Sequence, residues 1–242
     1  MPHFFINSKS VNGNIVEFSE DYKHLVKSLR LRAGEKLKLI DENSTSYETE
    51  VKDIKPSSIV AEIKKSYQST RELGFDLYLA QVPLRSDAQN LLIEKATELG
   101  VVKVYPLISK NCALSNSVIE KKVDKWGKIM VESSKQCERA KIPTCAEPID
   151  FESLLKSEKF DKIIAFCERN TEISLKEYLR ENPIKKGEKV LVIIGPEGGF
   201  SQKEFDMFKS HNLPVVSLGD LILKADTAVT VALGDIVYEY KG

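Results

Sequence analysis

The pattern of hydrophobic and polar positions changes near residue 70 of the chain. Before that point, short apolar runs of strand character follow one another closely and are separated by turn residues such as Asn12-Gly13 and Pro56-Ser57. Closely spaced strands of this kind predict a small β-barrel. One helix is expected over residues 21–30, where apolar residues recur at helical spacing. The expected strands span residues 4–6, 14–18, 36–40, 47–54 and 58–63.

After residue 70, longer stretches of helical period alternate with apolar runs of strand character. This alternation predicts an α/β fold with a mostly parallel sheet and helices on both faces. Ligands bind such sheets at the carboxyl ends of the strands, so we expect a site in the loops after Phe166, Ile194 and Leu218. The expected strands span residues 75–82, 101–108, 162–166, 190–194 and 215–218, and the expected helices span residues 87–99, 118–139, 172–179, 201–210 and 227–238.

Composition narrows the class of protein. The 242 residues are 42% hydrophobic and 30% charged, which is typical of a folded globular protein and excludes a disordered or collagen-like chain. No apolar run approaches the ~20 residues that span a bilayer, so no membrane segment is expected. The four cysteines form no C-x-x-C pair and the three histidines have no metal-ligand spacing. We therefore expect a cytoplasmic protein without a metal.

Positive charge is concentrated in one segment, although the chain as a whole has a formal net charge of zero. Nine cations and only four anions lie between Lys103 and Lys141. Such a segment is a candidate contact surface for a polyanion, and the alternative is an ordinary solvated helix face. If it binds RNA, binding weakens steeply with added salt.

The most informative motif lies within residues 190–204. A β-rich apolar run ends in a Gly-Pro-Glu-Gly-Gly loop, and Ser201 with Glu204 then forms a capping box that starts a helix. This strand, loop and helix can bring a ligand close to the backbone. The spacing differs from the dinucleotide-binding and P-loop patterns, which excludes both.

A second motif follows in residues 216–233, where a strand ends at Gly219 and a loop with Lys224 and Asp226 leads into another helix. The two motifs together match G-P-E-G-G-[FL]-S and L-G-x-x-I-L-x-x-x-T-A. In this combination the chain resembles the 16S rRNA (uracil-N3)-methyltransferase family, which belongs to the SPOUT enzymes with a C-terminal trefoil knot.

The resemblance extends over nearly the whole chain. His24, Leu29-Arg30 and Gly34 match the family's H-x-x-x-V-L-R-x-x-x-G motif, and residues 95–101, 106–109 and 126–143 match its next conserved segments. The family implies a PUA-like β-barrel RNA-binding domain over residues 1–70 and a knotted SPOUT α/β methyltransferase domain over residues 71–242. It also implies S-adenosylmethionine as methyl donor, a homodimer, and 16S rRNA of the small ribosomal subunit as substrate.

The resemblance also implies a set of site residues. Asp226 and Glu197 are candidates for the base that accepts the N3 proton, and Lys224, Arg30 and Arg139 are candidates for stabilising the developing anion. The residues expected to bind RNA are Arg30, Arg32, Arg85, Gln136 and Arg139. The residues expected to bind the cofactor are Cys167, Glu168, Gly195, Pro196, Glu197, Gly198, Leu218, Gly219, Ile222, Leu223 and Thr227.

Other functions stay open at this point. A SPOUT enzyme could act on another RNA site, in a tRNA or in 23S rRNA. A non-catalytic RNA-binding or assembly factor could have kept the scaffold, since Ala88, Asn90 and Leu221 depart from the family pattern. An enzyme acting on a small nucleotide would leave the N-terminal strands without a role.

Overall fold

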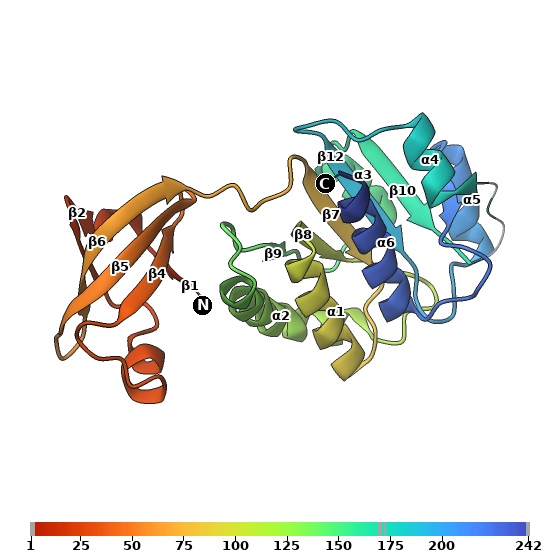
Figure 1. Ribbon diagram of the computed structural model, residues 1–242. Helices are drawn as coiled ribbons and strands as arrows, with labels where there is room; N and C mark the ends of the chain where they lie inside the picture. Colours follow the sequence, from red (N-terminus) through yellow and green to blue (C-terminus); the bar gives the residue numbers. More distant parts are fainter. Residues whose placement is uncertain (1–2, 169–170, 172, 241–242) are drawn as a thin grey trace. The chain divides into compact units, whose positions relative to one another are not determined.

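The computed structural model describes residues 3–168, 171 and 173–240, and the chain forms two compact units (Figure 1). The first unit comprises Met1–Glu72 and Glu132–Ile142, and the second comprises Leu73–Val131 and Pro143–Gly242. Residues 132–142, which we expected in the second domain, therefore belong to the first unit. Their charged side chains account for this, because Arg139 forms an ion pair with Glu72.

A six-stranded sheet builds the first unit, in the order β1-β4-β5-β6-β3-β2. Only β1 and β4 pair in parallel, and the other neighbours are antiparallel. Strand β3 shows why the chain is extended here: Val16 and Phe18 are buried, whereas Ile15 and Glu17 are exposed. The strands are β1 (His3–Ile6), β2 (Val11–Asn12), β3 (Ile15–Phe18), β4 (Lys36–Asp41), β5 (Thr45–Ile54) and β6 (Ile59–Gln68).

The helix expected over residues 21–30 is much shorter in the structure. A 3₁₀ turn covers Ser8–Ser10, and a single π-helical segment covers His24–Ser28. Of the apolar residues expected on the helix, only Leu25 is fully buried, while Tyr22 and Val26 are partly buried against the same core. Arg30 ends it with a φ of 53°, in the left-handed region that few side chains adopt.

A seven-stranded sheet forms the centre of the second unit, in the order β11-β13-β10-β12-β7-β8-β9. All of its neighbouring strands pair in parallel. The expected α/β fold with a parallel sheet is thus confirmed. The strands are β7 (Asp76–Gln81), β8 (Val101–Pro106), β9 (Thr144–Cys145), β10 (Lys162–Phe166), β11 (Ile173–Ser174), β12 (Lys189–Ile194) and β13 (Val215–Ser217).

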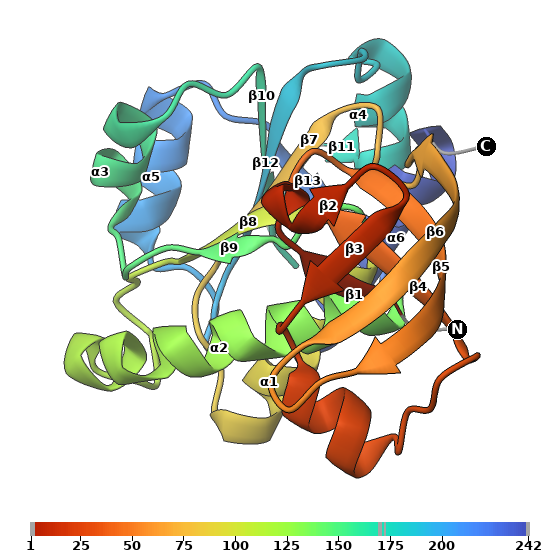
Figure 2. The same ribbon diagram turned by 90° about the vertical axis from the view of Figure 1, so that its left-hand side faces the viewer.

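Helices cover both faces of this sheet. Leu77 and Leu79 of β7 point into one apolar cluster with α1, α2, α4 and α6, whereas Tyr78 and Ala80 point into a second cluster with α3 and α5. Figure 2 shows α3 and α5 side by side on the second face. No helix in the described part of the chain is long and apolar enough to cross a membrane. The helices are α1 (Ser86–Glu98), α2 (Asn116–Gln136), α3 (Phe151–Ser157), α4 (Leu175–Glu181), α5 (Gln202–Ser210) and α6 (Ala225–Tyr240).

Five short elements were not expected from the sequence: the 3₁₀ turn and β2 in the first unit, and β9, α3 and β11 in the second. Helix α3 buries only Phe151 and Leu154, so it has too few apolar positions to show a helical period. The helix expected over residues 172–179 begins at Leu175 instead, because the two residues before it pair with β13 as strand β11. Glu172 lies outside the described residues.

Candidate active site

A cavity of about 540 Å³ opens at the carboxyl edge of the parallel sheet. The segments after β10, β12 and β13 all contribute to its wall, which confirms the expectation of a site where these three loops meet. The first residues of α6 and the start of α1 complete it. The wall consists of Leu84, Ala88, Phe166, Cys167, Glu168, Ile194, Gly195, Pro196, Glu197, Gly199, Phe200, Leu218, Gly219, Leu221, Ile222, Leu223, Lys224, Ala225, Asp226 and Ala228.

Most residues named from the sequence as cofactor or catalytic candidates lie in this wall. Four do not. Gly198 and Thr227 are exposed neighbours of lining residues, and Arg139, like Arg30, lies in the first unit. Arg30 belongs to the first unit, whereas the whole cavity belongs to the second. The sequence-derived residues in the wall are Cys167, Glu168, Gly195, Pro196, Glu197, Leu218, Gly219, Ile222, Leu223, Lys224 and Asp226.

The glycine loop after β12 requires small residues at two points. A Cβ on Gly195 would lie 3.0 Å from the Phe200 ring, so the ring can pack on this backbone only because residue 195 is glycine. Gly199 has a φ of 69°, and a Cβ there would lie 3.2 Å from Oε1 of Glu168. The loop can therefore fold back and place Phe200 in the cavity wall.

Hydrogen bonds fix this loop at both ends. The side-chain amide of Asn111 donates to the carbonyl oxygen of Gly199 at 3.0 Å. At the start of α5, Ser201 and Glu204 form the expected capping box, and Glu204 also accepts from the backbone N–H of Lys110. Burial opposes ionisation of Glu204, but the hydrogen bonds from Ser201 outweigh it and lower its pKa. The segment after β8 thus braces the loop that forms the cavity.

Cys167 lies in the cavity wall directly after β10 and is almost fully buried. Burial, followed by the nearby charge of Glu168, raises the pKa of the thiol to about 12. Because the thiolate is the nucleophilic form of cysteine, this side chain remains a neutral packing group at neutral pH.

Two carboxylates and one ammonium group border the cavity where chemistry could occur. Asp226 lies in the first turn of α6, and its Oδ1 accepts the backbone N–H of Thr227 at 2.9 Å. Lys224 and Glu197 line the wall with exposed side chains. Within the described residues, no group of three or more His, Cys, Asp or Glu side chains could hold a metal ion.

Sequence reasoning missed part of the wall. Leu84 lies between β7 and α1, and Ala88 lies in the first turn of α1. The sequence does not reveal that β7 lies next to β12 in the sheet. Ala225 and Ala228 could have been found, because small residues three apart at the start of a helix leave room for a ligand. Leu221 lines the cavity mouth and is 81% exposed.

The residues expected to bind RNA fall into two groups. Arg32, Arg85 and Gln136 have exposed side chains, as does Arg30. Arg139 differs from the expectation of a surface cation: it is only 5% exposed, and its Nη2 lies 2.7 Å from Oε2 of Glu72. Its charge is used inside the first unit, because a buried guanidinium needs a partner.

Comparisons with known proteins agree with this architecture. Residues 71–237 match the RNA methyltransferase domain, and residues 19–64 match the RNA methyltransferase PUA domain. Two relatives carry the name ribosomal RNA small subunit methyltransferase E. The protein from Mesomycoplasma hyopneumoniae is 30% identical, covering 96% of this chain and 97% of its own length. The protein from Rickettsia conorii is 28% identical, covering 96% and 93%.

A solved structure shares the same fold. The ribosomal RNA small subunit methyltransferase E from Neisseria gonorrhoeae, bound to S-adenosyl methionine, superposes with a TM-score of 0.85 at 21% identity, covering 99% of this chain and 98% of that one. The fold and the site thus define an RNA methyltransferase with a PUA domain. Within that class, the chain belongs to the ribosomal RNA small subunit methyltransferase E family. This confirms the family resemblance found in the sequence.

Proposed function

We propose that this protein transfers the methyl group of S-adenosylmethionine to N3 of a uridine in 16S rRNA of the small ribosomal subunit. The observation that carries the proposal is the cavity at the carboxyl edge of the sheet, where the glycine loop meets the segment with Lys224 and Asp226. Family membership supports the reaction class, and the relatives' name supports the substrate.

The cavity fits such a cofactor in size and chemistry. Its volume of about 540 Å³ lies within the range of about 300–1,000 Å³ that small-molecule sites occupy. The wall is mainly apolar or glycine, with a few charged groups at its border. When bound, S-adenosylmethionine supplies an electrophilic methyl group, so the protein needs no nucleophile of its own.

The chain's own residues would bind and orient the two reactants. Ile222 and Leu223 offer apolar side chains for the adenine ring, and the backbone from Gly195 onward can approach a ligand closely. The buried thiol of Cys167 adds an uncharged surface. Holding the reacting atoms in line is the main contribution expected of such a site.

Removal of the N3 proton is the remaining chemical task. Asp226 and Glu197 can accept it, because both carboxylates line the cavity. The ammonium group of Lys224 can stabilise the negative charge that develops on the uracil ring when N3 loses its proton. We assign Asp226 as the base, since its carboxylate lines the cavity two residues after Lys224, the ammonium group that can stabilise the anion.

The first unit would act as a PUA-like barrel that contacts RNA, with Arg30 and Arg32 on its exposed surface. Arg85 and Gln136 are further candidates for RNA contacts. In keeping with the family, we propose a trefoil knot in the second unit, dimerisation through that unit, and a cytoplasmic location.

The test is transfer of isotopically labelled methyl from S-adenosylmethionine to small ribosomal subunits isolated from cells that lack this protein. Digestion of the rRNA then identifies the labelled nucleoside. Labelled 3-methyluridine is the expected product. Label in another nucleoside, or in another RNA offered in parallel, would replace the assigned target. If no RNA is labelled and the protein does not bind S-adenosylmethionine, the protein is a non-catalytic RNA-binding factor instead.

A further inference from the structure

The outward face of α2 carries a row of lysines. Ile119, Trp126 and Met130 of this helix are buried against the sheet, and Trp126 is only 1% exposed. Lys121, Lys125 and Lys128 are exposed. They follow one another at spacings of four and three residues, so they share the opposite face of the helix. We call them the α2 lysine row.

Three other cations of the basic segment form ion pairs elsewhere in the chain. Lys135 is buried and lies 2.8 Å from Asp21, and Arg139 pairs with Glu72. Lys103 faces a carboxylate after α3. By contrast, among the described residues no carboxylate oxygen lies within 4.0 Å of the ammonium groups of the α2 lysine row. Lys110, Lys122 and Lys141 also form no ion pair among the described residues, but within the basic segment only the row sets three exposed lysines on one helix face.

The spacing of the row is unfavourable for the isolated protein. Lys121 and Lys125 are four residues apart and Lys125 and Lys128 are three apart, so like charges are neighbours on the helix surface. Each such pair of like charges destabilises a helix. Asp124 and Glu132 each lie four residues from Lys128 along the helix, but Glu132 pairs with Lys135, and among the described residues neither carboxylate comes within 4.0 Å of an ammonium group of the row. A polyanion would remove this repulsion.

The segment that leads into α2 is attached to the rim of the cavity. Asn111 donates to the carbonyl oxygen of Gly199, which lines the cavity, and the N–H of Lys110 donates to Glu204. Helix α2 begins five residues after Asn111. The row starts within the second turn of the helix and extends about 10 Å along its axis, from Lys121 to Lys128.

We propose that the α2 lysine row binds the phosphate backbone of the RNA that enters the cavity. The proposal rests on the function proposed above and assigns the surface along which the substrate strand lies. Lysine ammonium groups are point charges without a base-reading geometry, so the row positions RNA without selecting its sequence. It leaves the binding of S-adenosylmethionine unchanged, because none of its members lines the cavity.

The test replaces the row in the full-length protein by the triple change Lys121→Gln, Lys125→Gln and Lys128→Gln. Glutamine has about the helix propensity of lysine, so α2 is retained. Affinity for small ribosomal subunits and for deproteinised 16S rRNA, both from cells lacking this protein, is measured over a range of KCl concentrations. Each lysine that meets a phosphate of single-stranded RNA contributes about 0.7 to the slope of log K against log salt, so the slope falls by about 2. At 0.1 M salt the affinity falls about 100-fold.

A matched triple change serves as control. It removes the same number of positive charges as the α2 variant, but from the edge of the sheet where the strands begin. Its three lysines are exposed, and among the described residues none forms an ion pair. They are Lys156, Lys159 and Lys209. Replacing them with glutamine leaves the slope within about 0.5 of the wild-type value. Both triple variants bind S-adenosylmethionine as the wild type does, which shows that they are folded.

Three results overturn the proposal. One is an unchanged salt slope in the α2 variant, or the same decrease in both variants. Another is a wild-type protein that binds neither probe. A loss seen with subunits but not with deproteinised rRNA would assign the row to an acidic protein surface instead. These binding measurements do not require methyl transfer. If the wild type transfers no methyl group but the α2 variant still has a smaller salt slope, the proposed reaction is contradicted and the proposed RNA-binding surface is supported.

Discussion

Asp226 is the residue on which proton removal depends in the proposed reaction. We expect Asp226→Ala to lower the methyl-transfer rate about 100-fold or more, the range typical of a lost general base. Affinity for S-adenosylmethionine should change little, because the side chain accepts its hydrogen bond from the adjacent backbone N–H of Thr227. Single-turnover transfer and calorimetric cofactor binding measure the two effects separately.

The control for this change is Asp220→Ala, in the loop that precedes α6 and outside the cavity wall. It should leave both quantities near the wild-type values. Equal losses of rate and of cofactor affinity in Asp226→Ala would show that Asp226 has a structural role, and Glu197 would then become the candidate base.

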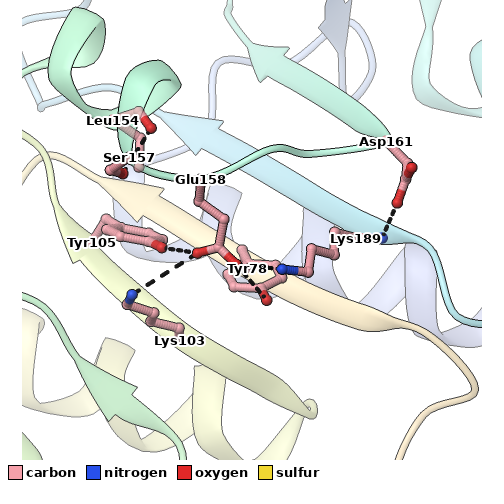
Figure 3. A network of polar contacts seen from close by, with 8 residues as sticks. All are labelled: Tyr78, Lys103, Tyr105, Leu154, Ser157, Glu158, Asp161 and Lys189. Carbon is pink, nitrogen blue, oxygen red and sulfur yellow. Dashed lines mark hydrogen bonds and ion pairs between the residues drawn. The ribbon is translucent and has the colours of Figure 1, made fainter.

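Glu158 is the centre of a polar network on the face of the sheet covered by α3 and α5 (Figure 3). Its carboxylate accepts the hydroxyl of Tyr78 at 3.0 Å and that of Tyr105, and it lies 2.7 Å from Nζ of Lys189. The ammonium group of Lys103 lies 3.9 Å away. Burial opposes ionisation of Glu158, but the hydrogen bonds from Lys189, Tyr105 and Tyr78 outweigh it and lower its pKa.

This network predicts a pH-dependent stability. Because the pKa of Glu158 is lower in the folded than in the unfolded chain, its contribution is fully present above the ordinary value of 4.5 and is lost as the pH falls through the folded-state pKa. Glu158→Gln should lower the free energy of unfolding at pH 7 by about 2 kcal/mol and flatten its decrease below pH 4.5. Urea unfolding at several pH values measures both effects.

The matched change is Glu181→Gln at the exposed end of α4. It removes the same charge without disturbing the network, and it should shift the free energy of unfolding by less than about 0.5 kcal/mol. If Glu158→Gln behaves in the same way, the network contributes nothing measurable to stability.

The glycine loop after β12 is the element that depends most on support from outside itself. Asn111→Asp keeps the shape of the side chain but replaces its N–H donor with an anionic oxygen next to the carbonyls of Gly198 and Gly199. The loss of a hydrogen bond worth about 1 kcal/mol should raise the KM for S-adenosylmethionine about 5-fold and leave kcat unchanged. Steady-state kinetics test this split, with Asn212→Asp at the far end of α5 as control. A fall in kcat alone would contradict a positioning role for Asn111.

Long, strongly patterned elements could be predicted from the sequence, whereas boundaries set by single residues could not. Strand β10 has the bounds expected from its apolar run, residues 162–166. The helix expected over residues 118–139 ends at Gln136, because Glu138 has a φ of 58°, which stops the helix. The cavity loops could be located because they follow buried strands. The contribution of Leu84 could not, since it depends on the order of strands in the sheet.

On the scale of the whole molecule, the first unit is assembled from two separate parts of the chain. Glu72 accepts the guanidinium of Arg139 at 2.7 Å and the backbone N–H of Ala140 at 2.8 Å. Asp21 pairs with Lys135. The returning segment, residues 132–142, therefore supplies the partners of two acidic groups of the first part.

A fragment that ends at residue 72 should consequently be unstable. Without residues 132–142, Glu72 and Asp21 lose their cationic partners, and breaking a buried ion pair lowers stability by about 3–5 kcal/mol. We expect a fragment of residues 1–72 to unfold at much lower urea concentration than the first transition of the intact chain. Adding a synthetic peptide of residues 132–142 should raise its midpoint, and an unchanged midpoint would show that the fragment is self-sufficient.

The returning segment also sets the order of events when the chain is synthesised. A nascent chain emerges from the ribosome from its N-terminus, and N-terminal domains usually fold first. Here the first unit can be completed only after Ile142 has emerged, when β7, α1, β8 and α2 of the second unit are already outside the ribosome. The two units must therefore fold in overlapping periods. A pause in translation before Ile142 would keep the first unit incomplete, because residues 132–142 would not yet be available to it.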